Sequence, residues 1–188
     1  MASVFGHIAA SSALGWSFLP QKSTSKALLL AGVCAFIPDA DVLAFRFDVP
    51  YHSIWGHRGW SHSLSFALGF GVLIAWLFYR QDKEWWKMAL WFVAATASHP
   101  LLDMLTTGGM GCALWWPWST ERLFFPVRLI RVSPLEVRDF FSKWGMRILL
   151  SEVLWIGIPS ILLIGLSWVT RRTLAWIRSG IPPPDRLE

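Results

Sequence analysis

The feature that most constrains the fold is a series of apolar runs long enough to cross a lipid bilayer. A spanning helix needs ~20 residues. Three runs suit this length: Leu64–Tyr79 with interfacial residues on each side, Trp85–Leu105 and Ile148–Val169. Two others, Val4–Leu19 and Ala27–Phe45, are shorter or more polar and end at or contain a proline. The pattern predicts an all-α, polytopic membrane helix bundle of about five membrane-associated helices, the first two short, tilted or reaching only part of the way.

The composition agrees with a membrane location. Hydrophobic residues make up 54% of the chain and charged residues 15%, whereas a soluble domain carries about 25% charged residues. The 14 Trp residues suit a protein whose aromatic rings collect at both water–lipid interfaces. Cys34 and Cys112 are interpreted as buried small hydrophobes. The net charge of +5 does not indicate nucleic-acid binding, because the basic residues are scattered among apolar runs and form no basic face.

The chain is expected to form one membrane-embedded helical domain over residues 1–180. Within it, an interfacial loop region is expected over 107–143, since its Trp-rich and Arg-rich composition suits a segment lying along the membrane surface. A disordered tail is expected over 181–188. Residues 1–19 lack the positively charged start of a cleavable signal peptide, so insertion is expected through helices that stay in the protein.

If all five helices cross the membrane, the two ends of the bundle differ in charge pattern. One end carries the N-terminus and the loops at 39–62 and 106–145. The other end carries basic residues packed into short segments: Lys22, Lys26, Arg80, Lys83, Lys87, Arg171, Arg172 and Arg178. Positive charge in short loops favours the cytoplasmic side. The sequence therefore predicts a multi-pass protein of the inner (cytoplasmic) membrane, with the first end facing the non-cytoplasmic side.

Seven ionisable residues fall at this non-cytoplasmic end, although the hydropathy pattern does not require it. Imidazole nitrogens and carboxylate oxygens together ligate zinc and similar divalent ions, and ionisable residues within a membrane protein's apolar segments are functional candidates. We therefore predict a divalent metal centre, with zinc as the first choice and manganese as the alternative. Its candidate ligands are His7, Asp39, Asp41, His57, His62, His99 and Asp103. The sequence leaves open which of His57 and His62 is a ligand.

The spacing of these residues sets conditions on the centre. His99 and Asp103 are four residues apart, so on a helix they lie one turn apart on the same face. Pro100 disfavours helical geometry at His99, and a kink there could turn the imidazole inward. Asp39 and Asp41 would splay on a regular helix and could converge only if an irregular turn begins at the preceding proline.

Each residue taken alone has a plainer interpretation. Asp39 and Asp41 could cap a helix, and a single histidine at a helix end is usually a hydrogen-bonded interfacial residue. We prefer that interpretation for His52. The set as a whole favours a metal centre, because clustered ionisable groups mark functional sites.

The motifs "PDAD", "HRGWSHS" and "HPLLDMLTTGG", followed by "LWWPWS", resemble the LexA-regulated inner-membrane metal-dependent hydrolases, the YdjM-like family. The resemblance runs from about His7 to about Pro126 and implies a metal-dependent hydrolase. A more distant likeness is to zinc-dependent phospholipase C and related nucleases, which share the order of the histidines and aspartates. No histidine follows Asp103, so one or two metal ions are expected rather than three, unless a glutamate takes the place of the missing ligands: Glu121, Glu136 or Glu152.

These features together predict a membrane-embedded hydrolase acting on a phosphoester bond in a lipid or another amphiphilic substrate. Asp39 or Asp41, if not a ligand, could act as general base, and Arg58 and Arg122 are candidates to bind a phosphate bidentately. The alternative is a non-catalytic membrane metal-binding or transport protein. Transport is the weaker version, because the cytoplasmic halves of the third and fourth runs offer almost no polar lining. Haem ligation fits less well than either. The sequence leaves the oligomeric state open.

Overall fold

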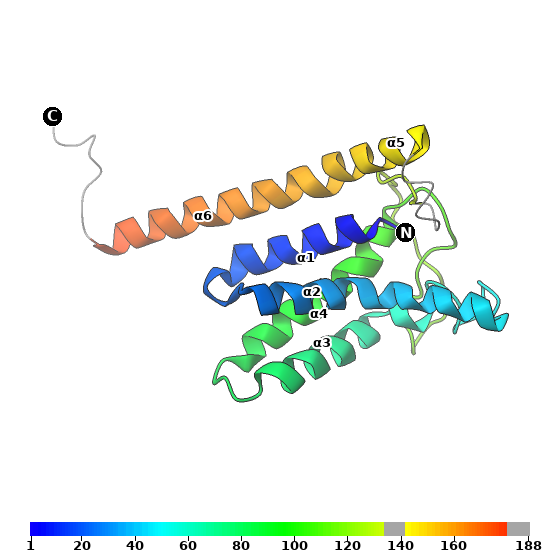
Figure 1. Cartoon of the computed structure of the whole chain (residues 1–188), viewed down its shortest axis with the longest axis horizontal. Helices are drawn as coiled ribbons and strands as arrows, with labels where there is room; N and C mark the ends of the chain where they lie inside the picture. The colour runs from blue at the N-terminus through cyan, green and yellow to red at the C-terminus, as the bar shows by residue number, and fades with distance from the viewer. Residues whose placement is uncertain (134–141, 180–188) are drawn as a thin grey trace.

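The computed structural model describes residues 1–133 and 142–179, and within them the protein is an all-α bundle (Figure 1). Its helices are α1 (Val4–Phe18), α2 (Ser25–Phe36), α3 (Leu64–Tyr79), α4 (Trp85–Met104), α5 (Lys143–Glu152) and α6 (Ile158–Ser179). Shorter elements are the 3₁₀ helices η1 (Pro20–Lys22), η2 (Ile37–Phe47) and η3 (Trp60–His62) and the π-helical turn η5 (Val153–Gly157). The prediction of an all-α bundle is confirmed. The expected disordered tail lies outside the described residues, as do residues 134–141 of the expected interfacial loop.

Hydroxyl side chains set the helix starts. The N-cap residue of α1, α2, α3 and α5 accepts a hydrogen bond from the backbone N–H three residues further on; these caps are Ser3, Thr24, Ser63 and Ser142. Such a cap satisfies an amide that the helix N-terminus leaves unpaired and contributes about 1 kcal/mol.

The core between α2, α3 and α4 is built from small side chains. Gly71 of α3 lies directly against the backbone of α4, since a Cβ atom there would stand 2.4 Å from the backbone nitrogen of Val93. Small residues let membrane helices approach this closely. Around this contact, the buried residues include Ala27, Ala31, Cys34, Ala75, Met88, Phe92 and Ala95. Cys34 and Cys112 are both buried and free, as expected.

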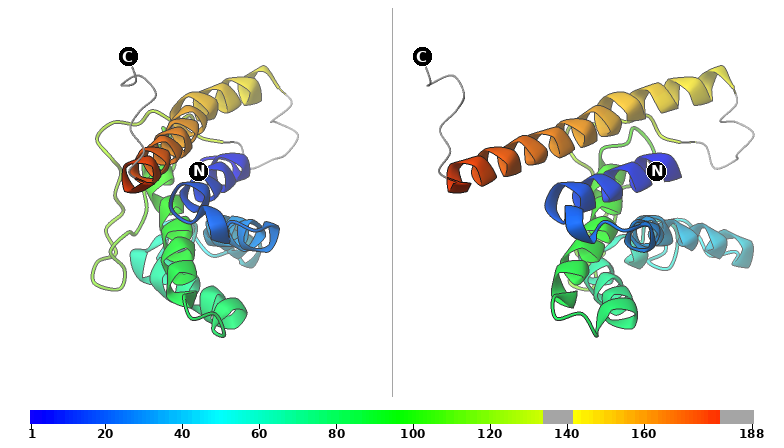
Figure 2. Two further views of the ribbon diagram at one scale, coloured as in Figure 1. Left: turned by 90° about the vertical axis from the view of Figure 1, so that its left-hand side faces the viewer. Right: turned by 60° about the vertical axis from the view of Figure 1, so that its left-hand side comes forward.

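The last helices form one long rod beside α1. Residues 143–179 continue through α5, η5 and α6, and α6 leaves most of its surface exposed (Figures 1 and 2). Within the described residues, two helical stretches are long and apolar enough to span a membrane, Ser25–Phe47 and Lys143–Arg178, and Leu64–Tyr79 is a shorter apolar helix. Five crossings stay a prediction.

Two local expectations have different outcomes. The chain leaves α-helical geometry at Ile37–Pro38 and continues as the 3₁₀ helix η2, so the irregular segment at Pro38 is present. In contrast, α4 remains helical through His99 and Pro100. No break in the helix is therefore needed to direct His99 inward.

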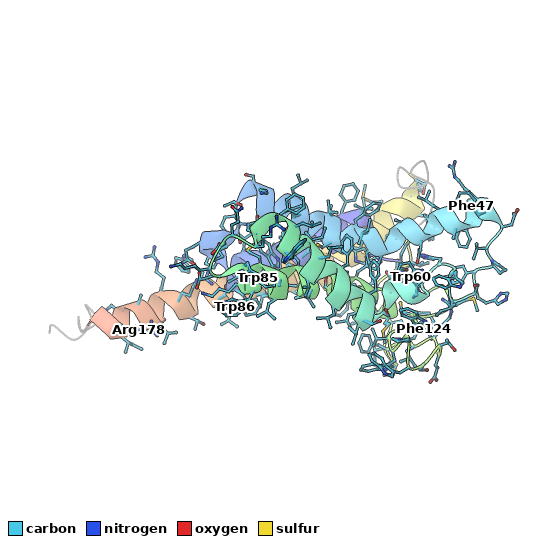
Figure 3. The ribbon with its side chains drawn as sticks, turned by 90° about the horizontal axis from the view of Figure 1, so that it is seen from below. Phe47, Trp60, Trp85, Trp86, Phe124 and Arg178 are labelled. Atoms are coloured by element: carbon cyan, nitrogen blue, oxygen red, sulfur yellow. The ribbon has the colours of Figure 1, made fainter. Side chains whose placement is uncertain are left out.

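The two ends of the bundle carry different aromatic groups (Figure 3). Trp85 and Trp86 lie toward one end, whereas Phe47, Trp60 and Phe124 lie toward the other. The loop after α4 closes the second end, because its backbone hydrogen-bonds to the end of α4, to Arg58 and to the start of α3. Trp118 in this loop is 82% exposed, and contact of the loop with the membrane interface stays a prediction.

Candidate metal centre

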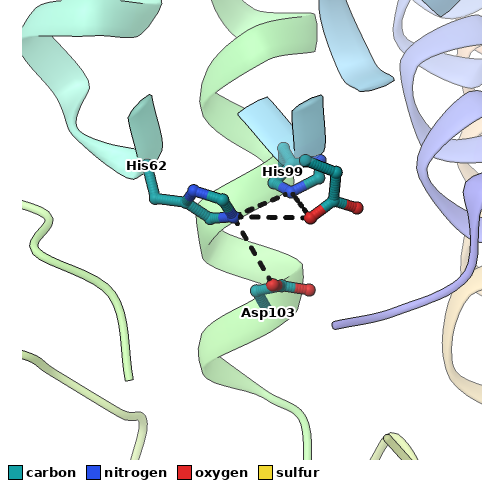
Figure 4. Close-up of side chains that lie close together, drawn as sticks. His62, His99 and Asp103 are labelled. Atoms are coloured by element: carbon teal, nitrogen blue, oxygen red, sulfur yellow. Dashed lines mark hydrogen bonds and ion pairs between the residues drawn. The ribbon is translucent and has the colours of Figure 1, made fainter. Parts of the chain in front are cut away.

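Five ionisable side chains from four separate segments meet at the end of the bundle that carries the N-terminus. His7 comes from α1, Asp39 from η2, His62 from η3, and His99 and Asp103 from α4. All five are buried, with at most 1% of their surface exposed. Figure 4 shows His62, His99 and Asp103 directed toward one another.

Four of these residues each offer a ligand atom, and the four atoms lie within 4.8 Å of one another: Asp39, His62, His99 and Asp103. The Nε2 atom of His99 is 3.1 Å from Nε2 of His62 and 3.2 Å from Oδ1 of Asp39. The Nε2 atom of His62 is 3.6 Å from Oδ1 of Asp39 and 3.7 Å from Oδ2 of Asp103. Atoms bound tetrahedrally to zinc at ~2.0–2.1 Å lie ~3.3 Å apart. The spacing therefore fits one small cation held by all four residues.

Hydrogen bonds on the far side of each imidazole fix which nitrogen faces the cluster. Nδ1 of His99 is 2.6 Å from the carbonyl oxygen of Ala35, which can only accept, so Nδ1 carries the proton. Nδ1 of His62 is 3.1 Å from Oδ2 of Asp41, a carboxylate acceptor. Metal-binding histidines are commonly held in this way by a carbonyl or a carboxylate. Both Nε2 atoms are therefore directed at the cluster, where each offers a ligand atom.

A proton on Nε2 of His62 would give a hydrogen bond to only some of the acceptor atoms in the cluster. Burial alone would lower the pKa of His62, but the neighbouring carboxylates of Asp39 and Asp41 outweigh it and raise the pKa to about 9. One proton on Nε2 can be donated to one acceptor at a time, whereas three acceptors surround it. Within the described residues, no donor is aligned for a hydrogen bond to either oxygen of Asp39, whereas Oδ2 of Asp103 has the guanidinium of Arg58 as its ion-pair partner. Because buried carboxylates are costly without partners, this donor set fits a divalent cation better than a proton.

Asp41 and His57 lie beside this cluster and form a second group with His62. Asp41 Oδ1 is 2.6 Å from Nδ1 of His57, and Oδ2 accepts hydrogen bonds from Ser61 Oγ at 2.6 Å and from the backbone nitrogen of Arg58 at 3.0 Å. The carboxylate of Asp41 is thus fully partnered, unlike that of Asp39. The geometry favours His62 over His57 as the ligand, and gives Asp41 the role of holding His62 in place.

His7 touches the cluster from the side of α1. Its ring stacks on His99 with centroids 3.8 Å apart, and its Nε2 lies 3.5 Å from Oδ1 of Asp103. Neither ring nitrogen of His7 has a hydrogen bond within the described part of the chain. His7 therefore has a nitrogen available at the edge of the four-residue group.

The two predicted phosphate-binding arginines are both committed to protein groups. Arg58 is fully buried and adopts a left-handed backbone conformation with φ 62°. Its Nε pairs with Oδ2 of Asp103 at 3.0 Å, and its other nitrogens donate to Gly108 O and Thr106 Oγ1. Burial alone would lower the pKa of Arg58, but Asp103 outweighs it and keeps the pKa above its ordinary value. Arg122 donates to the backbone carbonyls of residues 51, 53 and 57, so it stabilises that loop, and phosphate binding by either arginine stays a prediction.

Comparison with known proteins shows the family of the chain. The model of the YdjM inner membrane protein family matches residues 1–174. The chain belongs to this family. Inner membrane protein YbcI of Escherichia coli (strain K12) is 37% identical over 178 residues, which cover 92% of this chain and all of the relative. No solved structure matches the chain. The YdjM-like resemblance and the inner-membrane location are confirmed, and the more distant likeness to phospholipase C stays a prediction.

In this member of the YdjM family, one buried glutamate has a structural partner near the centre. Glu152 is 5% exposed and accepts hydrogen bonds from the backbone nitrogen and the hydroxyl of Ser3. The neighbouring Ala2 donates its backbone N–H to Oδ1 of Asp103 at 2.7 Å. Glu152 thereby fixes the segment that covers Asp103. Of the other two glutamates considered as ligands, Glu121 is exposed and Glu136 lies outside the described residues.

The sequence interpretation missed the groups that support the ligands. Ser61, Thr106 and the carbonyl of Ala35 have no signal of their own in a single sequence. Glu152 did have such a signal in the sequence, because a carboxylate within an apolar run needs a hydrogen-bond or ion-pair partner.

Proposed function

We propose that this protein is a membrane-embedded, metal-dependent hydrolase that cleaves a phosphoester bond in a lipid or another amphiphilic substrate at the non-cytoplasmic interface. The observation that carries the proposal is the convergence of two imidazoles and two carboxylates with the spacing of a metal's coordination shell. Structural zinc sites are mostly rich in cysteine, whereas catalytic sites combine histidine and carboxylate ligands with an open position. With four protein ligands, the open position would be a fifth one, which zinc can adopt. When bound, zinc or manganese here would lower the pKa of its water to roughly 7 and polarise a phosphoryl oxygen.

The residues around the cluster divide the remaining tasks. His7 has an unpartnered ring nitrogen against Asp103 and is placed to accept the proton of an attacking water, which makes it a better candidate for general base than the fully hydrogen-bonded Asp41. Arg58 holds Asp103 by an ion pair and supplies a fixed positive charge beside a phosphate. The four ligands and His7 are buried, so turnover also requires the covering segment at residues 1–3 to open.

The complete burial of the cluster favours one alternative, a non-catalytic metal-binding protein in which the ion only stabilises the bundle. Transport receives less support. Apolar side chains fill the core between this cluster and the other end of α4, including Met88 and Phe92, and a polar route through the bilayer would need polar lining there.

A metal-loading experiment separates catalysis from structural binding. The protein is purified in detergent, stripped with a chelator, and reloaded with zinc or manganese, and the bound metal is counted by mass spectrometry. We expect one ion per chain and metal-dependent hydrolysis of a phospholipid or a nitrophenyl phosphodiester. His62→Ala should remove both, whereas His52→Ala, an exposed histidine outside the cluster, should change neither. Stoichiometric binding with no turnover on phosphomonoesters and phosphodiesters would support the non-catalytic alternative.

The side of the membrane is tested by cysteine labelling in whole cells. Both native cysteines are buried, so background reaction is low. Glu121→Cys in the loop that closes the metal end should react with a membrane-impermeant thiol reagent, and Lys83→Cys at the opposite end should be protected. The reverse pattern would place the cluster on the cytoplasmic side.

A further inference from the structure

An apolar groove runs between α1 and α2 on the outside of the bundle. It has a volume of about 340 Å³, and its walls are Val4 and Ile8 of α1 and Leu29, Val33 and Phe36 of α2. Gly32 forms its floor, because a Cβ atom there would meet only Ile8 within 4 Å, at 3.7 Å. Four of the large side chains along the groove stay 39–70% exposed: Ile8, Leu29, Val33 and Phe36. Within the described residues, no other segment covers these four.

One end of this groove lies next to the metal centre. Val4 precedes His7 by three residues, and Phe36 precedes Asp39 by three, so each lies one turn from a residue of the cluster on the same side of its helix. The groove extends from there along α2, within the stretch Ser25–Phe47 that is long and apolar enough to span a membrane. A ligand lying in it would have one end in the hydrocarbon region and the other beside His7 and Asp39.

We propose that this groove holds an acyl chain of a bilayer phospholipid, with its phosphate-bearing headgroup at the Val4–Phe36 end. The argument rests on the membrane environment: the chain is an inner membrane protein, and the exposed apolar surface of α2 belongs to a stretch that is long and apolar enough to span the bilayer. A free glycine at the floor leaves room for a flexible chain, and the lining offers no polar group that would select a peptide. The proposal names the substrate class of the same site and therefore rests on the proposed function.

The test is a substitution whose larger side chain fills the groove. Gly32→Leu projects a side chain past Ile8 into the cavity, and since leucine is a better helix former than glycine, the fold is not weakened. The matched control is Gly69→Leu on α3, where a Cβ atom meets nothing within 4 Å and the position is exposed. Both variants and the unchanged protein are incubated in detergent micelles with a trace of phosphatidylglycerol that carries a photoreactive diazirine on one acyl chain. Detergent replaces non-specific lipid, and cross-linked peptides are mapped by mass spectrometry.

We expect cross-links in α1 and α2 of the unchanged protein and of Gly69→Leu, reduced at least fivefold in Gly32→Leu. Hydrolysis of long-chain phospholipid should fall in the same variant, while hydrolysis of a short nitrophenyl phosphodiester is retained. Equal labelling of α1 and α2 in all three proteins would overturn the groove proposal. Absent labelling with a change from dimer to monomer in Gly32→Leu would overturn it in favour of a second copy of this chain. If no protein hydrolyses any phosphoester but the labelling pattern holds, the proposed function fails and the lipid site remains.

Discussion

Replacing Asp41 by asparagine tests the assignment of Asp41 as a support for His62 rather than a metal ligand. Asp41 receives four donor contacts: from Nδ1 of His57 and Oγ of Ser61 at 2.6 Å, from the backbone nitrogen of Arg58 at 3.0 Å, and from Nδ1 of His62 at 3.1 Å. Asparagine offers one acceptor oxygen, and its NH₂ group would face donors. His62 then loses the charged acceptor that orients its ring.

The expected loss of metal affinity follows from that role. Removing a hydrogen-bond partner behind a metal-binding histidine typically costs 10- to 100-fold in affinity, or about 1.4–2.7 kcal/mol. Asp41→Asn should therefore still bind one ion per chain, with zinc affinity lowered by about 10- to 100-fold. Asp39→Asn removes a ligand, because neither oxygen of Asp39 has another partner among the described residues, and it should lower the amount of bound ion as well as the affinity.

The assay is competition for zinc against a coloured chelator in detergent, with bound metal counted after desalting. Asp48→Asn is the matched control: Asp48 is exposed and has a left-handed backbone conformation with φ 55°, which asparagine tolerates. The reasoning is refuted if Asp41→Asn binds no zinc, which would make Asp41 a ligand, or if its affinity equals that of the unchanged protein.

Three further predictions concern the charge of the cluster and its packing. A proton and a cation compete for Nε2 of His62, whose pKa is raised to about 9. Below that pH, zinc affinity should increase about tenfold for each unit by which the pH is raised. A flat profile of affinity between pH 6.5 and 8.5 would contradict this. Arg58→Met leaves Asp103 without its ion-pair partner and should lower the free energy of unfolding of the metal-free protein by about 3–5 kcal/mol. In thermal melts, zinc should reduce the difference in stability between Arg58→Met and the unchanged protein. A stability difference that zinc leaves the same would argue against Asp103 as a ligand. Gly71→Ala forces α3 away from α4 at Val93 and should destabilise the bundle by about 1–3 kcal/mol; Gly69→Ala, in open space, should not.

The fold was largely predictable because it depends mainly on the positions of apolar runs along the sequence. A run of apolar residues with hydroxyl caps at its start gives a helix wherever it lies, and the expected run Leu64–Tyr79 coincides with α3. The final helix was less predictable. It extends beyond the expected Ile148–Val169 on both sides, because its ends are set by the Ser142 cap and by polar residues that continue in helical conformation rather than by the end of an apolar run.

The sequence was enough to predict which residues gather at the candidate site, but not the role of each residue. Helix ends at the same side of the bundle had to bring His7, His99 and Asp103 near one another. The difference between Asp39 and Asp41 depends on the 3₁₀ geometry after Pro38, which directs two residues so close in sequence to opposite sides of His62. A single sequence does not show that geometry.

The preference for His62 over His57 likewise depends on a tight loop that the sequence pattern does not reveal. A Cβ atom at Gly59 would stand 1.9 Å from the carbonyl oxygen of Ile54, so this loop folds back on itself in a way that only glycine permits. Arg58 within it takes a left-handed conformation and turns its guanidinium into the protein. The burial of Arg58, which sequence reasoning treated as a free phosphate binder, follows from that turn.

Charge balance gives an independent reason to expect a divalent ion in this family member. The carboxylates of Asp39, Asp41 and Asp103 surround the histidines, and Arg58 is the permanent cation in contact with them among the described residues. With neutral histidines, these four side chains carry two negative charges in a buried environment where uncompensated charge is costly. The amine of Met1 also lies near Asp103, but burial lowers its pKa, so it is a weaker cation than Arg58. A proton on His62 removes one of the two negative charges, whereas a divalent cation removes both and also supplies a partner for the unpaired oxygens of Asp39. The same ion that would activate a water for hydrolysis would thus also make the buried cluster compatible with a protein folded in the membrane, and we expect its removal to lower stability as well as any activity.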